Sequence, residues 1–331
     1  MSQGTGGFDL PSYLLGKSNS RGKNSKKIEM LSKIVNGTYE GTDLTIKFAD
    51  EIAKSPYNGD VWAWIQGRIT AGNFDDIYVF DWIPVVADSH TYHAEVMGIN
   101  TYKNYGDTGH ITGNHIDFIF NELWHKSTIG YNAVNVNNGY PAFTPSGGTE
   151  QPEDPWYWTA SRIYKYMNSL QGYIINGSSL PFPMYLADYR TGGVYYYLPA
   201  NLKAVISPKR VYLPQRLPTS TALSTSDTSV GWTDLGNLWL PSENEIFGRP
   251  TYGTSQGSNN TGGDMLYPYF AVGSEHRVKY LNGERTTYWM RNARGGASTS
   301  FTIVSSSGYA SYTNASNSHG ISVCFRVMAA N

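Results

Sequence analysis

The chain has 331 residues, of which 40% are hydrophobic, 14% aromatic and only 15% charged. So many aromatic residues with so little charge exclude a disordered chain, and the composition also excludes a coiled coil over most of the length. The formal net charge of −1 provides no overall field that would attract nucleic acid or an anionic membrane.

The sequence shows no membrane segment, no secretion signal and no disulfide framework. It has no apolar run of about 18 residues that could cross a bilayer. Residues 1–15 lack the charged and apolar regions of a signal peptide. The single cysteine, Cys324, cannot form an intrachain disulfide or a thiolate metal cluster. We therefore expect stability to come from a large aromatic core.

The N-terminal part differs in composition from the rest. An apolar strip lies between glycines and a Lys/Arg-rich stretch, and it consists of Phe8, Leu10, Tyr13, Leu14 and Leu15. This arrangement predicts a segment that docks onto another protein, although a frayed tail is the alternative. Helices are expected over 26–35 and 42–54. We assign 1–56 as an N-terminal anchoring arm with short helices, and 57–331 as one elaborated domain.

The middle of the chain predicts short strands and helices separated by long loops. Apolar runs predict strands at 61–65 and 77–86, with a turn at 71–73 between them. Helices are expected at 114–125, with Asn114 as the N-cap, and within 156–170. Polar, glycine-rich or Ser/Thr-rich stretches predict loops at 135–155, 219–229 and 252–263.

The C-terminal third carries the most specific pattern. Residues 236–248 predict a strand, a proline turn and a short helix that Ser242 caps. Further along, 287–292, 300–304 and 320–327 predict strands of an antiparallel sheet, and Cys324 falls on the last of them.

The order W-x-P-S-x-x-E, Y-W-x-R, S-F-x-x-V and G-I-x-V-x-F-R-V, found between 232 and 327, resembles C-type-lectin-like domains of bacteria and bacteriophages. Their fold is shared by the formylglycine-generating-enzyme superfamily and by phage tropism determinants. The resemblance implies an α+β fold of antiparallel sheets and short helices. It implies that Trp289 and Arg291 lie on a central strand. The resemblance also implies a structural role for one set of residues: Trp239, Leu240, Pro241, Glu245, Trp289, Phe325 and Arg326.

The resemblance also implies a bacteriophage virion protein, assembled in the host bacterial cytoplasm and displayed on capsid or tail. As a capsid decoration protein, head fibre or tail receptor-binding protein, it would form homo-oligomers. It would attach to other virion proteins through the arm and present its lectin-like domain to a host-surface glycan or protein. Two alternatives remain open: a purely structural decoration protein without a ligand, and a glycan-active enzyme or bacterial adhesin.

Signals for catalysis or bound metal are weak. The formylglycine enzymes use two cysteines with copper, and this chain has one cysteine. The segment 151–154 (Gln-Pro-Glu-Asp) lacks the Trp-Asn-Asp that accompanies it in calcium lectins. The carboxylate pairs Asp75/Asp76 and Glu243/Glu245 have simpler roles at a turn and a helix start.

Five histidines lie close together in the sequence: His90, His93, His110, His115 and His125. They lack the paired histidines and glutamate that a zinc hydrolase carries on one helix. We therefore expect no enzymatic activity, no metal and no cofactor.

Ligand binding is the site function that we consider next, with plain solvent-exposed loops as the alternative interpretation of the same stretches. Loops of the C-terminal third carry tyrosines, whose faces stack on sugar rings, and polar side chains that bind hydroxyls. The candidate ligand-binding residues are Arg291, Asn292, Arg294, Tyr309, Tyr312, Asn314 and Asn317.

Overall fold

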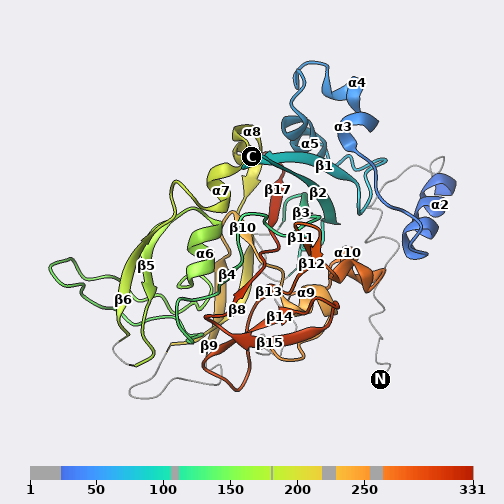
Figure 1. Ribbon diagram of the computed structural model, residues 1–331. Coiled ribbons are helices and arrows are strands. Elements are labelled where there is room, and N and C mark those ends of the chain that lie inside the picture. The colour runs from blue at the N-terminus through green and yellow to red at the C-terminus, as the bar shows by residue number, and fades with distance from the viewer. Residues whose placement is uncertain (1–23, 106–111, 180–181, 218–228, 254–263, 331) are drawn as a thin grey trace, which may run out of the picture.

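The computed structural model describes residues 24–105, 112–179, 182–217, 229–253 and 264–330 (Figure 1). Antiparallel sheets and short helices make up its α+β fold, as the sequence predicts. Several predicted features lie outside the described residues: Phe8, Leu10, Tyr13, Leu14, Leu15, His110 and most of the loops 219–229 and 252–263.

The largest sheet has six antiparallel strands in the order β1-β2-β3-β17-β10, with β7 also paired to β17. β3 and β17 lie in its middle, and their register places Phe325 opposite Phe118. The final strand, predicted at 320–327, is therefore confirmed as a core strand only in its second half, since β17 begins at Cys324. The bounds are β1 (Trp82–Ala87), β2 (His90–Ile99), β3 (His115–Phe120), β7 (Ile206–Ser207), β10 (Leu238–Trp239) and β17 (Cys324–Met328).

The strand predicted at 61–65 is wrong, because this stretch opens the helix α5 (Val61–Thr70). The carboxylate of Asp60 caps the helix by accepting hydrogen bonds from the backbone N–H of Trp62 at 2.9 Å and of Ala63 at 3.2 Å. A short apolar run fits a buried helix as well as a buried strand, so periodicity alone did not separate them.

The strand predicted at 77–86 is confirmed only in its second half. Phe80 has a positive φ of 78°, a left-handed conformation that interrupts an extended strand. β1 therefore begins at Trp82.

The helix predicted at 114–125 is also wrong. This stretch contains β3, in which every residue is buried. A strand covered on both faces loses the alternation of apolar and polar residues that identifies strands in a sequence.

A second sheet has three strands, β13 (Tyr288–Ala293), β14 (Ser300–Val304) and β15 (Ala310–Asn314), in that order. β13 is an edge strand of this sheet, so the expectation that Trp289 and Arg291 lie on a central strand is wrong. β17 pairs with β3 in the large sheet instead. The strands predicted at the C-terminal end thus belong to two sheets.

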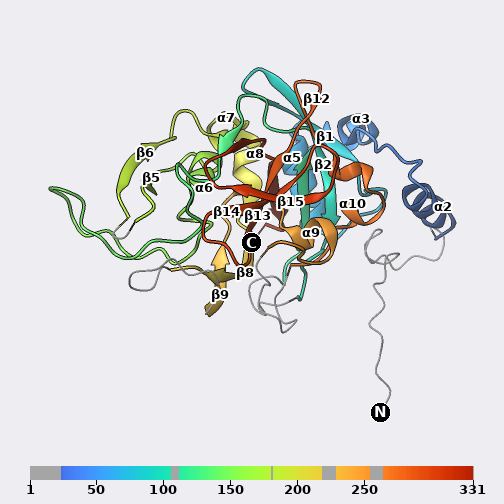
Figure 2. The same ribbon diagram turned by 60° about the horizontal axis from the view of Figure 1, so that its bottom comes forward.

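The remaining elements are short. Four ribbons pair β11 with β12, β4 with β16, β5 with β6 and β8 with β9. In both ribbon views the β5–β6 ribbon lies at the periphery, on the side away from α2 (Figures 1 and 2). The strands are β4 (Ile129–Gly130), β5 (Gln171–Ile175), β6 (Met184–Asp188), β8 (Arg210–Gln215), β9 (Ser229–Asp234), β11 (Tyr280–Leu281), β12 (Glu284–Arg285) and β16 (Ser318–His319).

Helices occupy the predicted stretches 26–35, 42–54 and 156–170, although the last two hold only short ones. The helix predicted after the proline turn is confirmed as α9, and Ser242 and Glu245 form its capping box. The helices are α2 (Asn24–Val35), α3 (Leu44–Lys47), α4 (Ala49–Ile52), α6 (Arg162–Met167), α7 (Val194–Tyr197), α8 (Ala200–Val205), α9 (Glu243–Phe247), α10 (Pro268–Ala271) and the 3₁₀ turn η2 (Glu275–Arg277). Among the described helices, none has the length and apolarity needed to cross a membrane.

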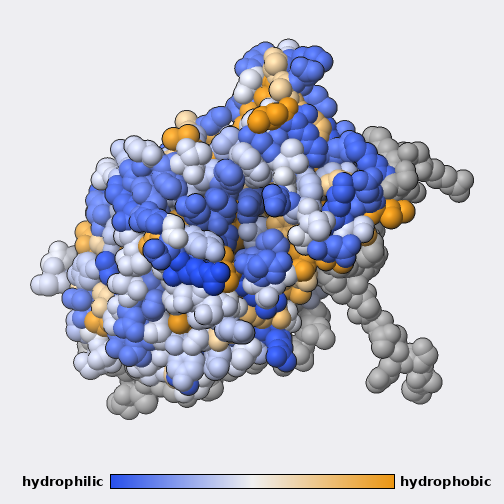
Figure 3. Space-filling model, turned by 45° about the vertical axis from the view of Figure 1, so that its right-hand side comes forward, coloured by the Kyte–Doolittle hydropathy of each residue, from blue (hydrophilic) through white to orange (hydrophobic). Residues whose placement is uncertain are grey.

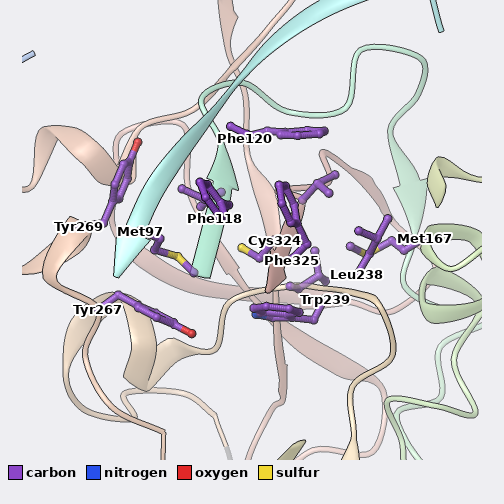
Figure 4. Close-up of a cluster of buried hydrophobic side chains, with 14 of the residues drawn as sticks. Met97, Phe118, Phe120, Met167, Leu238, Trp239, Tyr267, Tyr269, Cys324 and Phe325 are labelled. Atoms are coloured by element: carbon purple, nitrogen blue, oxygen red, sulfur yellow. The ribbon is translucent and has the colours of Figure 1, made fainter. Parts of the chain in front are cut away.

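The core is aromatic and continuous. Phe118 and Phe325 stack at 5.2 Å, and Cys324 lies beside them, with Trp239 below (Figure 4). Burial raises the pKa of the Cys324 thiol, which makes it a poor nucleophile.

The same core extends into the N-terminal part of the chain. Ile34, Leu44 and Ile52, which lie before residue 57, are buried in it. The division between arm and domain at 57 stays a prediction.

The surface facing the viewer in Figure 3 is largely hydrophilic. Apolar residues form several small groups on it, separated by hydrophilic ones.

Candidate functional site

Three exposed or half-buried side chains meet beside the three-stranded sheet. Arg294 follows β13, Tyr312 lies on β15, and Tyr252 belongs to the segment after α9. The guanidinium carbon of Arg294 is 3.3 Å from the centroid of the Tyr312 ring, and the rings of Tyr252 and Tyr312 are 5.1 Å apart. The tyrosines are 37% and 38% exposed. We call these three residues the Tyr–Arg patch.

A buried carboxylate positions Tyr252. Glu243, at the start of α9, accepts hydrogen bonds from the backbone N–H of Tyr252 at 3.1 Å and of Gly253 at 2.7 Å. A Cβ on Gly253 would lie 2.9 Å from the Cβ of Asn292 and 2.9 Å from a carboxylate oxygen of Glu243. Only glycine therefore allows this close approach.

Backbone hydrogen bonds fix the position of Arg294. Its N–H donates to the carbonyl of Ser300 at 3.0 Å, and the N–H of Gly295 donates to the carbonyl of Tyr252 at 2.9 Å. The fully buried Arg216 donates to the carbonyl of Arg294 at 3.3 Å. The patch therefore rests on a fixed backbone, which reduces the entropy lost when a ligand binds.

Of the predicted ligand-binding residues, the structure brings Arg294 and Tyr312 into contact. Tyr309, which is 73% exposed, lies at the turn between β14 and β15. Asn314 and Asn317 are exposed, and Asn317 donates to the hydroxyl of Thr313 at 2.6 Å.

Asn292 and Arg291, in contrast, are buried. Asn292 is 1% exposed, and its Oδ1 accepts a hydrogen bond from the backbone N–H of Glu243 at 2.6 Å. Arg291 is 0% exposed and donates to Glu245 at 3.1 Å and to Asp264 at 2.5 Å. In this structure both residues support the site from inside and present no group to an external ligand.

Tyr252 is the patch residue that the sequence analysis did not name. It opens the loop 252–263, which was predicted, but no local pattern distinguishes it from other loop tyrosines. The signal that would have found it is Glu243, because a buried carboxylate at a helix start needs N–H donors.

Glu245 is the most heavily bonded carboxylate near the site. It pairs with Lys209 and Arg291, and it accepts from the hydroxyl of Tyr102 at 2.7 Å and the N–H of Ser242 at 2.7 Å. Burial opposes its ionisation, but Arg291 and Lys209 lower its pKa to about 2. Glu245 is thus an ionised structural group.

The other candidate carboxylates also have structural partners. Asp75 forms an ion pair with Lys27 at 3.1 Å, and Asp76 accepts from the hydroxyl of Tyr78 at 3.1 Å. Asp154 accepts from the hydroxyl of Thr159 at 2.7 Å.

The described histidines are divided among separate contacts. His90 and His125 stack at 4.9 Å, His93 stacks on Trp82 at 3.7 Å, and His115 is fully buried. Within the described ranges, no group of three or more His, Cys, Asp or Glu side chains is arranged to hold a metal ion.

The predicted structural positions all lie in the interior. The buried residues are Trp239, Leu240, Pro241, Glu245, Trp289, Phe325 and Arg326.

Comparison with known families gives one match. The model of a family described as "Domain of unknown function (DUF6273)" matches residues 145–329, a range that includes the whole Tyr–Arg patch. No curated protein and no solved structure matches the chain.

Proposed function

The chain belongs to the DUF6273 family, and we propose that this member is a non-enzymatic recognition protein on the surface of a bacteriophage particle. Residues 57–331 would form a lectin-like domain, with its signature half at 232–327, that binds a saccharide of the host cell surface. The Tyr–Arg patch would be the surface that contacts the saccharide.

The observation that carries this proposal is the contact of the half-buried Arg294 with the face of the exposed Tyr312, with Tyr252 beside it. Tyrosine rings offer a rigid apolar face at low entropic cost, and the hydroxyl at the ring edge binds polar groups. A sugar ring, apolar on its C–H faces and polar at its rim, matches that surface.

The carboxylates favour binding over catalysis. Glu243 and Glu245 are buried and bonded to several partners, so neither presents its carboxylate to a substrate in this conformation.

The virion placement and the lectin-like assignment rest on the sequence pattern between 232 and 327 and on the apolar N-terminal strip. The antiparallel sheets and short helices agree with such a domain.

The binding proposal is tested on a saccharide array with the purified chain, Tyr312→Ala and Tyr196→Ala. Tyr196 is a matched control, since it is 48% exposed and also contacts one aromatic neighbour, Tyr197. We expect the parent and Tyr196→Ala to bind the same saccharides, and Tyr312→Ala to bind about tenfold more weakly, which corresponds to about 1.4 kcal/mol.

Absence of binding to every saccharide would contradict the proposal and favour a decoration protein without a ligand. Mass spectrometry of purified particles tests the virion placement separately, and absence of the chain from them would exclude it.

A further inference from the structure

Arg294 carries a charge that the described residues do not neutralise. Its guanidinium contacts the face of Tyr312. The arginines before and after Arg294 in the sequence, Arg291 and Arg326, both form ion pairs. Within the described residues, no ion pair joins Arg294 to a carboxylate.

The nearby carboxylates have other partners. Both oxygens of Glu243 accept backbone N–H groups of the Tyr252–Gly253 segment. Asp264 pairs with Arg291. The sequence 254–263, which connects Gly253 to Asp264, contains no Asp or Glu. Among the residues that the structure describes, no carboxylate therefore balances the positive charge at the patch.

The contact that the described residues make with the guanidinium of Arg294 is with the face of the Tyr312 ring. A guanidinium flat against an aromatic ring keeps its N–H donors in the plane, where they can form two parallel hydrogen bonds to a carboxylate or phosphate. The stack also restricts the long arginine side chain before a ligand arrives, so less entropy is lost on binding.

We propose that the saccharide bound at the Tyr–Arg patch is anionic, with a carboxylate or phosphate group that Arg294 binds while Tyr252 and Tyr312 contact its ring. This inference rests on the proposed function, since it presumes a saccharide at the patch. An anionic group would supply the missing counter-charge at Arg294.

The test uses the full chain on an array with three sets of oligosaccharides: uronate-bearing, phosphate-bearing and neutral. Inorganic polyphosphate serves as an anion without sugar rings. Binding is measured for the parent, Arg294→Gln, Arg294→Lys and Tyr312→Ala, at low and high NaCl, and circular dichroism checks that each variant is folded. The first two sets distinguish a carboxylate from a phosphate as the recognised group.

We expect binding to one or both anionic sets and weakening by salt, because screening reduces the attraction of exposed charges. Arg294→Gln should weaken binding about tenfold or more, which corresponds to about 1.4 kcal/mol. Arg294→Lys should recover only part of it, because an ammonium cannot form the paired hydrogen bonds.

Binding to neutral saccharides that depends on Tyr312 and not on Arg294 would overturn this inference and leave the proposed function intact. Equal binding to polyphosphate would overturn it as well, since charge alone would then explain the contact. Absence of binding to every saccharide would overturn both.

Discussion

Asp117 and Arg326 face each other on the neighbouring strands β3 and β17 and share two hydrogen bonds, from Nε at 2.7 Å and from Nη2 at 2.8 Å. Both side chains are buried, and the hydroxyl of Tyr267 donates to the same carboxylate at 2.7 Å. Burial opposes the charge on Asp117, yet Arg326 lowers its pKa to about 2. The pair therefore places two charges in the centre of the large sheet, where only this register satisfies them.

Removing one partner should destabilise the protein strongly. Asp117→Asn keeps the shape of the side chain but leaves the charge of Arg326 uncompensated, which costs about 3–5 kcal/mol in buried pairs. Urea unfolding at pH 7 measures this loss. Glu29→Gln, which breaks the exposed pair with Lys33, is the control and should leave the urea midpoint nearly unchanged. A loss below about 1 kcal/mol for Asp117→Asn would contradict the account.

The sequence predicted best those features whose signal lies in adjacent residues. The cap at Ser242 and the short helix after it were predicted, and both are present, with Glu245 completing a capping box. In the stretches that form α5 and β3, periodicity could not distinguish a helix from a strand. Trp64 and Phe118, like most of their apolar neighbours, are buried, so no exposed polar face marks either period. Tertiary packing decided these elements.

The binding site was predictable only in part. Arg294 and Tyr312 were named from loop composition, but their contact depends on the pairing of β14 with β15. Tyr252 reaches the patch because the Glu243 carboxylate accepts from its backbone N–H, while Asn292 accepts from the backbone N–H of Glu243. Such long-range support has no local pattern in the sequence.

A second stability prediction concerns Trp289. It is fully buried, and its indole N–H donates to the carbonyl of Ile129 at 2.7 Å. Trp289→Ala should lower the free energy of unfolding by about 3–5 kcal/mol, because a large cavity replaces the ring. Tyr309→Ala, at an exposed position of the neighbouring hairpin, is the control and should be nearly neutral. If both variants melted within a degree of the parent, Trp289 would not be a core residue.

The stability of the protein should depend on pH because His115 is buried as a neutral ring. Its Nε2 lies 3.3 Å from the backbone N–H of Tyr102 and its Nδ1 lies 3.2 Å from the carbonyl of Gly113. These contacts suit a neutral ring that accepts the first hydrogen bond and donates the second. Burial, and next Arg326, lower its pKa from 6.5 to about 3. Below pH 6.5 the unfolded chain therefore binds a proton that the folded chain does not bind. The free energy of unfolding falls as the pH drops.

The size of this effect follows from the proton difference. One proton changes the free energy of unfolding by about 1.4 kcal/mol per pH unit, so about 2 kcal/mol is lost between pH 6.5 and pH 5. Urea unfolding of the parent and of His115→Asn at pH 7 and pH 5 measures it. We expect the variant to lose about 2 kcal/mol less than the parent over this interval. Equal losses would show that His115 accepts a proton in the folded state.

Chelation should leave the protein unchanged. The described residues hold no metal-binding cluster, so EDTA should shift neither the melting temperature nor saccharide binding. A bound metal stabilises the folded state in proportion to its binding free energy. A fall of several degrees after chelation, reversed by calcium or zinc, would therefore reveal a site that these residues do not show.

Two N-terminal truncations test the anchoring arm. Every core residue that the structure describes lies at or after Ile34, so deletion of residues 1–23, which removes the apolar strip from Phe8 to Leu15, should leave the urea midpoint unchanged. Deletion of 1–35 also removes Ile34 and the ion pair between Lys27 and Asp75, and should destabilise the protein by about 2–5 kcal/mol.

Incorporation into particles distinguishes anchoring from folding. Apolar surface costs about 25 cal/mol per Å² where water contacts it. Under the proposed virion placement, we therefore expect the apolar sequence of the strip to be required for attachment to other virion proteins. We expect the 1–23 deletion to fold and yet to be missing from purified particles. Replacement of Leu14 and Leu15 by serine in the full-length chain is the control for chain length, and it should reduce incorporation too. If the shorter truncation enters particles at the parent level, the strip does not anchor the protein. If it unfolds instead, residues 1–23 belong to the fold.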